Sequence, residues 1–301
     1  MAIKILVTGR LPKAALDALN ETFEVHYAPN IKGEDLEEAL REVEGLIIRT
    51  ETKVTEDLLK KAPNLKLICR AGVGLDNVDL KACAARHIEV KNTSGANCVS
   101  AAEHTMGLIL SLARMIPQAN THLRSGNWDR DRFTGTELRG KTLGIIGFGN
   151  IGSRVSSLAQ AFSMKVIAND IVPKKDTLLL NLPDLLGASD FVTMHVPLTA
   201  ETHGMANKNF FSKMKEGSFF INASRGKVVV EKDLVDAIES SHLKGAALDV
   251  FFNEPLHKTS EILKTDKIIL TPHTAGQTIE SQNNMGLEAS RIMKEFLCPE
   301  S

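Results

Sequence analysis

Short apolar runs alternate along the chain with stretches in which apolar residues recur every three or four positions. Runs of this length are typical of buried strands, and the longer spacing is typical of helices that pack on a sheet. Strands and helices that alternate in this way predict a parallel α/β sheet. In the first third of the chain we expect strands at 3–7, 23–27, 45–49, 65–69 and 88–90, and helices at 12–19, 34–43, 56–61 and 79–86.

The same alternation resumes after residue 142. Before it we expect a helix from Ser100 to Arg114, opened by a capping box of Ser100 and Glu103. The polar stretch 125–140 that follows is either a surface loop or an arm that packs on a partner subunit. In the second half we expect strands at 143–146, 164–169, 191–196, 218–221, 245–250 and 267–270, and helices at 155–162, 231–240 and 279–297.

The strand at 143–146 runs directly into the glycine-rich turn GFGNIG at 147–152, and a helix pattern begins after it. In this setting Gly147 permits a tight turn, Gly149 lets a pyrophosphate approach the backbone, and Gly152 lets helix and strand pack closely. The free N–H groups at the start of the new helix would hold the phosphates. The unit therefore predicts a dinucleotide site.

A carboxylate follows at the expected distance. The next strand, 164–169, ends at Asp170, 18 residues after Gly152, close to the spacing of the residue that binds the ribose hydroxyls. A carboxylate there repels a 2′-phosphate, so NAD is favoured over NADP. Lys174 and Lys175 are the residues nearby that leave NADP open.

Composition narrows the class of protein. The chain has 301 residues, of which 43% are hydrophobic and 24% charged, with a net charge of −1. A chain of this size usually forms two domains, and this balance gives no reason to expect nucleic acid or a membrane as partner. Four cysteines without CxxC spacing and a start unlike a signal peptide indicate buried free thiols in a reducing compartment. We expect a cytoplasmic protein.

Four polar residues follow predicted strand ends in the second half: Arg225, Asp249, Glu254 and His273. The carboxyl ends of parallel strands form the ligand-binding edge of an α/β sheet, so these side chains are expected beside the nicotinamide. A guanidinium fork can hold a carboxylate, an imidazole can exchange a hydroxyl proton, and a carboxylate behind it orients the ring. Each alone is more often structural. No motif of a metal site or of a nucleophile elbow is present, so no metal is expected.

The chain resembles the D-2-hydroxyacid dehydrogenase family, and within it the branch that acts on phosphoglycerate. The resemblance covers nearly the whole chain and ends with the catalytic core, so we expect a short form without a regulatory domain. It is carried by GLIIRTETKVTEDLL (45–59), CRAGVGLDNVDL (69–80), NTSGANCVSAAEHTMGLILSLAR (92–114), GNWDRDRFTGTELRGKTLGIIGFGNIG (126–152), NASRGKVV (222–229), GAALDVFFNEPL (245–256) and TPHTAG (271–276).

The resemblance implies two doubly wound parallel-sheet domains. A Rossmann NAD-binding domain, 100–276, would be inserted in a flavodoxin-like substrate domain formed by 1–99 and 277–301. It also implies that His273 is the acid/base, Glu254 its orienting carboxylate and Arg225 the group that holds the substrate carboxylate and carbonyl. The residues implied to bind the cofactor are Val73, Gly147, Gly149, Asn150, Ile151, Gly152, Asp170, His195, Val196, Pro197, Ala223, Ser224, Arg225, Asp249, His273, Ala275 and Gly276.

The implied substrate is a small 2-hydroxy acid, phosphorylated in this branch. Arg49 and Arg70 match arginines of similar phosphoglycerate enzymes, and Arg130 would reach across a homodimer formed through 100–140. The loop of Gly72, Val73 and Gly74 would hold the substrate carboxylate, with Asn97 nearby. The implied reaction is NAD-dependent oxidation of D-3-phosphoglycerate to 3-phosphohydroxypyruvate, the entry to serine synthesis.

Two rival readings share these residues. A hydroxypyruvate or glyoxylate reductase, or another D-2-hydroxyacid dehydrogenase, would use the same Arg225, Glu254 and His273. A less favoured reading is an NAD-sensing binding protein similar to the C-terminal-binding corepressors.

The segment from Asp170 to Asp190 is shorter than the family usually has, so we expect the structure beyond the adenosine edge of the sheet to be trimmed.

Overall fold

The computed structural model describes residues 2–173 and 178–299 and divides into two compact units. Unit 1 is Met1–Asn97 with Gln277–Ser301, and unit 2 is Cys98–Gly276. The first boundary lies at Cys98 rather than at Ser100, because helix α5 (Cys98–Arg114) already begins there. Ser100 is therefore a buried residue of the first turn, and the predicted capping box at Ser100 is wrong.

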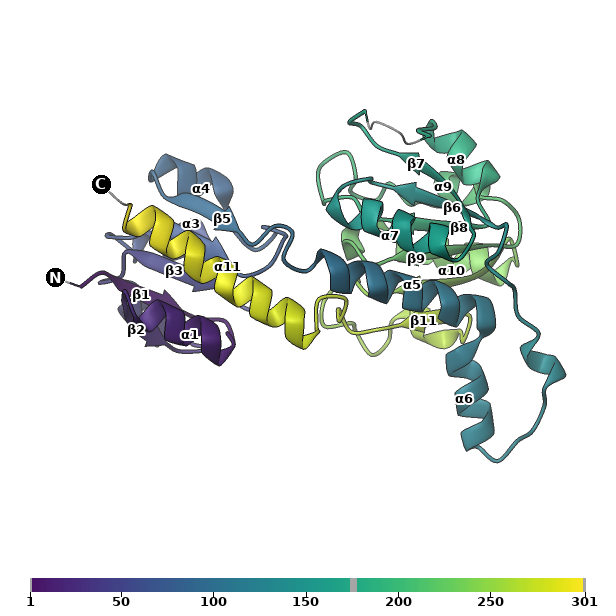
Figure 1. Cartoon of the computed structure of the whole chain (residues 1–301), viewed down its shortest axis with the longest axis horizontal. Coiled ribbons are helices and arrows are strands. Elements are labelled where there is room, and N and C mark those ends of the chain that lie inside the picture. Colours follow the sequence, from purple (N-terminus) through teal and green to yellow (C-terminus); the bar gives the residue numbers. More distant parts are fainter. Residues whose placement is uncertain (1, 174–177, 300–301) are drawn as a thin grey trace. The chain divides into compact units, whose positions relative to one another are not determined.

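Unit 1 is a five-stranded, fully parallel sheet in the order β2-β1-β3-β4-β5, which is the flavodoxin-like order. Helix α11 lies along this unit beside α1, so the two ends of the chain share one core (Figure 1). The elements are β1 (Lys4–Val7), α1 (Lys13–Asn20), β2 (Glu24–Tyr27), α2 (Gly33–Ala39), β3 (Gly45–Ile48), α3 (Glu56–Lys60), β4 (Leu67–Arg70), α4 (Leu80–Ala85), β5 (Glu89–Asn92) and α11 (Ile279–Leu297).

Unit 2 is a six-stranded parallel sheet in the order β11-β10-β9-β8-β6-β7. Beyond the edge strand β7, the residues that the structure describes form a bridge between Ala168 and Leu179 and no further strand, in line with the expectation from the short 170–190 segment. The elements after α5 are α6 (Ile116–Arg124), η1 (Asp131–Phe133), β6 (Thr142–Ile146), α7 (Asn150–Ala161), β7 (Lys165–Asn169), α8 (Leu182–Ala188), β8 (Phe191–Met194), α9 (Lys208–Lys213), β9 (Ser218–Asn222), η2 (Gly226–Val228), α10 (Glu231–Glu239), β10 (Leu243–Leu248), η3 (Glu261–Lys264) and β11 (Ile268–Leu270).

Two parallel-sheet α/β domains are thus confirmed, with local differences. Helix α2 ends at Ala39 rather than at residue 43, and α6 was not predicted. Thr55 caps α3, because its side chain accepts a hydrogen bond from the N–H of Leu58. Three cysteines are buried free thiols, but Cys298 is exposed.

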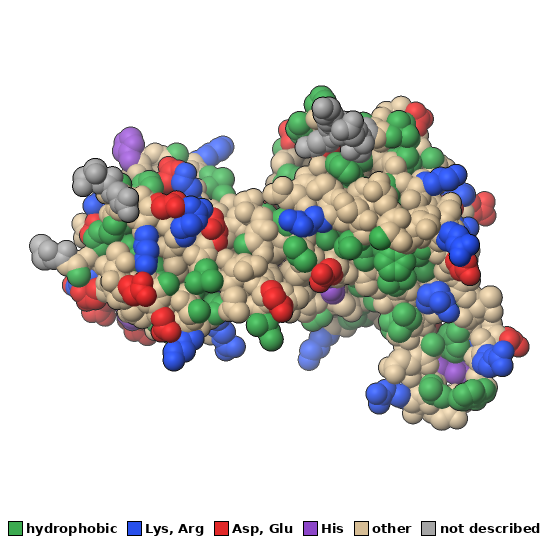
Figure 2. Space-filling model, in the orientation of Figure 1, with side chains coloured by type: hydrophobic (Ala, Val, Ile, Leu, Met, Phe, Trp, Pro, Cys, Tyr) green, Lys and Arg blue, Asp and Glu red, His purple; other side chains and the backbone are tan. Residues whose placement is uncertain are grey.

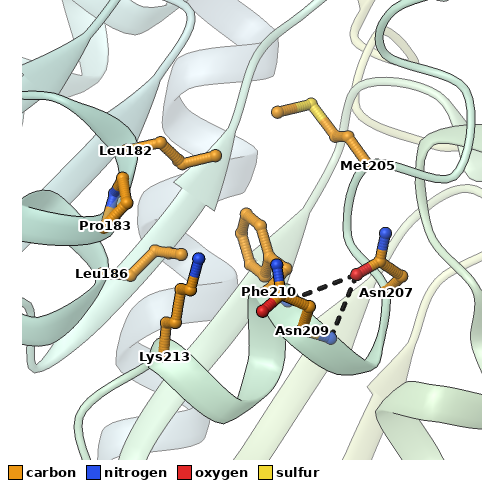
Figure 3. Close-up of a pocket in the computed structure, with 8 residues that line it drawn as sticks. All are labelled: Leu182, Pro183, Leu186, Met205, Asn207, Asn209, Phe210 and Lys213. Carbon is orange, nitrogen blue, oxygen red and sulfur yellow. Dashed lines mark hydrogen bonds between the residues drawn. The ribbon is translucent and has the colours of Figure 1, made fainter.

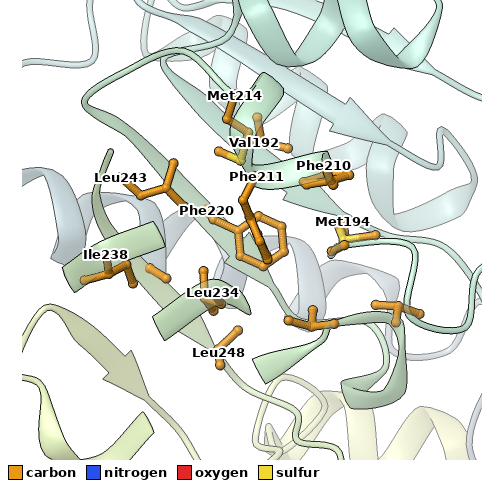
Figure 4. Close-up of a cluster of buried hydrophobic side chains, with 14 of the residues drawn as sticks. Val192, Met194, Phe210, Phe211, Met214, Phe220, Leu234, Ile238, Leu243 and Leu248 are labelled. Carbon is orange, nitrogen blue, oxygen red and sulfur yellow. The ribbon is translucent and has the colours of Figure 1, made fainter. Parts of the chain in front are cut away.

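The core of unit 2 holds its strand ends in place. On one face of the sheet, Phe211 and Phe220 lie edge to face with ring centroids 5.2 Å apart among aliphatic side chains from β8, β10 and α10 (Figure 4). Aromatic pairs of this kind stabilise a core beyond the area that they bury. The opposite face packs on α5 and α7. Because both faces are filled, the strands have little freedom to shift, and the turns at their carboxyl ends are fixed.

Charge on the surface is mixed. On the face shown in Figure 2, basic and acidic side chains are interspersed, and apolar side chains gather on the part formed by α6 and the segment after it. None of the residues of α6 is buried, and Trp128 is 80% exposed. Among the described residues, no helix is both long enough and apolar enough to cross a membrane.

Candidate active site

The glycine-rich turn has the geometry that its sequence predicts. Gly147 has φ +88°, and a Cβ there would lie 2.7 Å from the backbone of His195. A Cβ on Gly152 would lie 2.2 Å from the carbonyl oxygen of Gly147, so α7 packs closely on β6 only without one. A Cβ on Gly149, which caps α7, would enter open space. The turn therefore leaves room for a phosphate group where the backbone N–H groups of α7 begin.

Asp170 lies at this turn. Its carboxylate accepts hydrogen bonds from the N–H of Phe148 at 2.6 Å and of Val172 at 2.8 Å. A carboxylate has about four acceptor positions, so two remain for ribose hydroxyls. Lys174 and Lys175, the residues that left NADP open, lie outside the described residues. The turn and Asp170 together fit a dinucleotide without a 2′-phosphate.

The end of β8 lies on the other side of the glycine turn. His195 donates its backbone N–H to the carbonyl of Ile146, and its Nε2 lies 3.0 Å from the hydroxyl of Thr193. Burial lowers the pKa of His195 to about 4, so the ring is neutral at neutral pH. Strands β6 and β8 flank the point where the strand order reverses, which is where open α/β sheets bind ligands. The predicted residues Val196 and Pro197 continue from this edge.

Three residues with complementary chemistry meet in unit 2. Nδ1 of His273 lies 2.7 Å from Oε2 of Glu254, and Glu254 also accepts the N–H of Phe251. Burial opposes ionisation of Glu254, but the bond with His273, the N–H of Phe251 and the nearby charge of Arg225 outweigh it and lower its pKa. A carboxylate that stays ionised orients the Nδ1–H of the imidazole. Nε2 is left to exchange a proton with a ligand.

Arg225 is positioned by a turn after β9. The buried side chain of Asn222 accepts bonds from the N–H and the hydroxyl of Ser224 and donates to the carbonyl of Arg225. The guanidinium Nη1 donates to the carbonyl of Ser224 at 2.7 Å. A Cβ on Gly226 would lie 1.8 Å from the carbonyl oxygen of Phe251, so this glycine lets the Arg225 turn contact the turn that carries Glu254.

The turn that carries His273 is hydrogen-bonded to the buried carboxylate of Asp249. This carboxylate is 0% exposed and accepts the hydroxyl of Thr271 and the N–H groups of Thr274 and Ala275. Nε2 of His104, on α5, lies 3.3 Å from it. Burial opposes ionisation of Asp249, but the bonds from His104, Thr271, Thr274 and Ala275 outweigh it and lower its pKa. The carboxylate of Asp249, which was predicted to contact the cofactor, thus hydrogen-bonds in this structure to the turn that carries His273.

Two of the arginines expected to bind substrate, Arg49 and Arg70, lie at the carboxyl edge of the sheet of unit 1. Arg49 follows β3 and packs over Gly9, which follows β1. Strands β1 and β3 flank the reversal point of this sheet. The Nη1 of Arg49 donates to the side chain of Gln282 and to the carbonyl of Arg10. Burial lowers the pKa of Arg49, and Glu51 partly offsets this effect.

Arg70, at the end of β4, lies beside Arg49 in the same edge of unit 1. Its Nη2 donates to the hydroxyl of Thr50, which follows Arg49, at 3.2 Å. A Cβ on Gly72 would lie 2.6 Å from Nη1 of Arg70. The predicted residues Val73, Gly74 and Asn97 also belong to unit 1, and the carbonyl of Val73 accepts a bond from Asn92. Arg130 belongs to unit 2 and is exposed just before η1.

The comparison with known proteins identifies the family. The sequence profile described as "D-isomer specific 2-hydroxyacid dehydrogenase, NAD binding domain" matches residues 106–275. The chain belongs to this family. The match confirms NAD as the predicted cofactor and falls on the unit that holds the glycine turn and Asp170.

Relatives in this family differ in what they act on. A D-3-phosphoglycerate dehydrogenase of Methanocaldococcus jannaschii is 41% identical over 98% of this chain, which spans 57% of that protein. A hydroxypyruvate reductase of Thermotoga maritima is 39% identical over 97% of this chain and 98% of its own length. A D-lactate dehydrogenase of Aquifex aeolicus, solved with NAD and lactic acid, has a TM-score of 0.86 and 32% identity over 98% of this chain and 95% of its own. The chain thus spans a little over half the length of the phosphoglycerate dehydrogenases that it matches.

Sequence reasoning missed two residues, His104 and Gly226, that contact the turns carrying the predicted site residues. His104 gave no signal because the histidine lies in a predicted helix far along the chain from Asp249. Gly226 directly follows Arg225, and a glycine beside a polar residue at a strand end could have indicated a close backbone approach.

A small pocket of unit 2 is lined by no residue of the glycine turn or of the polar trio. It has a volume of about 90 Å³ and is lined by side chains of α8, α9 and the segment before α9 (Figure 3). Its polar residue Asn207 already accepts bonds from the N–H groups of Asn209 and Phe210 as the cap of α9. None of the predicted site residues lines this pocket, and we assign it no role in the chemistry.

Proposed function

We propose that the chain is an NAD-dependent dehydrogenase that oxidises D-3-phosphoglycerate to 3-phosphohydroxypyruvate, the entry to serine synthesis. The observation that carries the chemistry is the bond of 2.7 Å between His273 and Glu254, with the charge of Arg225 nearby. The phosphorylated substrate is supported by Arg49 and Arg70 at one sheet edge and by the similarity to phosphoglycerate dehydrogenases. A cytoplasmic location and a homodimer through 100–140 remain predictions.

In the proposed reaction Arg225 holds the carboxylate and the C2 oxygen of the substrate through its fork of N–H donors. Nε2 of His273 accepts the proton of the C2 hydroxyl as the carbonyl forms, and Glu254 stabilises the resulting imidazolium. NAD, when bound, supplies the acceptor for the hydride that leaves C2. The glycine turn, Asn150, Ile151 and Asp170 would hold it, with Val73, Ala223, Ser224 and Gly276 as further predicted contacts.

A second candidate is a hydroxypyruvate or glyoxylate reductase. It is favoured by the relative of Thermotoga maritima, because that match spans nearly the whole of both proteins. Its acid/base chemistry would be the same, run in the direction of reduction, and the phosphate would be absent. The two candidates therefore differ in whether Arg49 and Arg70, at the carboxyl edge of the unit 1 sheet, bind a phosphate group.

Initial rates on a panel of acids separate the candidates. We expect the purified chain to reduce NAD with D-3-phosphoglycerate, and to oxidise NADH faster with 3-phosphohydroxypyruvate than with hydroxypyruvate or glyoxylate. A preference for the unphosphorylated acids would reject the phosphoglycerate assignment and support the reductase. A chain that binds NAD and acts on no acid of the panel would favour the binding-protein reading instead.

Replacing Arg49 tests phosphate recognition. The Arg49→Ala variant is expected to raise KM for 3-phosphohydroxypyruvate by roughly 10- to 100-fold, because a hydrogen bond to a charged group contributes about 1.5–3 kcal/mol. KM for hydroxypyruvate should change by less than threefold. Arg49→Lys, which keeps the charge and loses the fork, should lie in between. Arg86→Ala, at the end of α4, is the control. Equal increases in KM for both acids would contradict a phosphate site at Arg49.

A further inference from the structure

The backbone at His273 is held in an uncommon conformation. His273 has φ +53°, in the left-handed region that residues other than glycine seldom adopt. Its N–H donates to the carbonyls of Asp249 and Thr271. A residue keeps such a conformation only when its surroundings determine it. The direction of the imidazole therefore depends on what fixes the turn on either side.

The carboxylate of Asp249 supplies that restraint. Thr271, two residues before His273, donates its hydroxyl to Oδ1 at 2.6 Å. The next two residues, Thr274 and Ala275, donate their N–H groups to Oδ1 and Oδ2 at 2.8 and 2.9 Å. One buried group thus binds the turn on both sides of His273. Its two oxygens can do so only while the carboxylate itself is held in one orientation.

His104 contacts both Asp249 and Thr271. Its Nε2 lies 3.3 Å from Oδ1 of Asp249 and 3.1 Å from the hydroxyl oxygen of Thr271. The hydroxyl of Thr271 has a single hydrogen, which it donates to Asp249, so its oxygen is an acceptor toward His104. The network therefore assigns the hydrogen to Nε2 of His104, which donates to Thr271 and Asp249.

We propose that His104 is a positioning residue, which fixes Asp249 and Thr271 and through them directs the imidazole of His273. This inference rests on the proposed role of His273 as the acid/base. His104 lies on α5, which packs on β10 and β11, the two strands whose ends carry Asp249 and the His273 turn. The N–H group of His104 thereby connects α5 to the turn that orients the imidazole of His273.

Three substitutions separate this role from simple helix packing. His104→Gln places an N–H donor close to the position of Nε2, whereas His104→Leu fills the space without a donor. His104→Asn keeps a polar group that is too short to reach Asp249. His242→Leu is the matched control, because His242 also donates through Nε2, to the carbonyl of Phe211, outside this network.

The first readout does not depend on activity. Hydrogen–deuterium exchange in a peptide that spans 271–276 reports the N–H groups of Thr274 and Ala275. We expect faster exchange in His104→Leu and His104→Asn, and exchange as in the unmodified protein in His104→Gln and His242→Leu. Equal exchange in the Gln and Leu variants would overturn the proposal, whatever the substrate proves to be. If His104→Leu does not fold, the Asn and Gln pair makes the same comparison.

The second readout is kinetic. We expect kcat to fall roughly 10- to 100-fold in His104→Leu, with KM for NAD unchanged, and to be restored in His104→Gln, since small displacements of a catalytic group have effects of this size. In a chain that already carries His273→Gln, adding His104→Leu should lower kcat no further. The same loss in both backgrounds would overturn the proposal. An unmodified protein that acts on no 2-hydroxy acid would instead refute the proposed function and leave the exchange test in force.

Discussion

Replacing His273 with glutamine is expected to lower kcat for oxidation of the 2-hydroxy acid by roughly 10²–10⁴-fold, the usual contribution of a general base. Glutamine keeps a hydrogen-bonding group in the turn but cannot take the proton of the C2 hydroxyl at neutral pH. Steady-state kinetics measures the loss, and calorimetry should still detect NAD binding, because the glycine turn and Asp170 are untouched.

An exposed histidine, His257, supplies the control for this variant. His257 is exposed and hydrogen-bonded through Nδ1 to the hydroxyl of Thr259, so its ring has a local partner much as His273 has Glu254. His257→Gln should leave kcat unchanged. Turnover by His273→Gln at the rate of the unmodified protein would remove His273 from the chemistry.

The second large effect is expected from Arg225→Gln. Losing a bidentate contact to the substrate carboxylate removes two charge-assisted hydrogen bonds of about 1.5–3 kcal/mol each, which corresponds to roughly 10²–10⁴-fold in kcat/KM. Arg225→Lys should recover only part of this, because a lysine offers no planar fork. Lys227→Gln, two residues away and exposed over the ring of Phe252, is the control and should keep kcat/KM.

The same variant also shifts the pH dependence. The charge of Arg225 is one of the causes that lower the pKa of Glu254, after burial, which raises it, and the bond with His273. Removing that charge raises the pKa of Glu254, so the carboxylate becomes protonated at a higher pH as the solution is acidified. The acid limb of the kcat profile should therefore move to higher pH in Arg225→Gln. An acid limb that stays in place or moves down would contradict a charge interaction between the two side chains.

The residues that could be recognised from the sequence are those whose role is local. In the turn at 147–152, Gly152 must be glycine because the carbonyl of Gly147 lies where its Cβ would be, and the spacing of the turn to Asp170 is set by one helix and one strand. Residues 170–190 are fewer than this family usually has, and this shortness likewise predicted that the structure beyond the adenosine edge of the sheet is trimmed. Such features depend on chain distance, and a linear pattern records them directly.

The residues that could not be recognised depend on contacts between distant parts of the chain. Gly226 is required because the carbonyl of Phe251 lies where its Cβ would be, and Gln282 accepts a hydrogen bond from Arg49 across 233 positions of sequence. The predicted capping box at Ser100 failed for a related reason. A serine in a helix pattern reads as a cap, but here the helix begins earlier and Ser100 is packed in the core.

The sequence by itself determined the alternation of strands and helices, the dinucleotide turn and the polar residues at the strand ends, because each of these follows from periodicity and from short-range backbone geometry. The family resemblance implied the pairing of Glu254 with His273, but only the tertiary structure shows their contact of 2.7 Å, the burial of Asp249 beside the turn, and the contact that His104 on α5 makes with Asp249. These contacts form only when the helices pack on the sheet. A buried carboxylate is costly in free energy unless it is hydrogen-bonded, and its hydrogen-bond donors come from parts of the chain that no sequence spacing specifies.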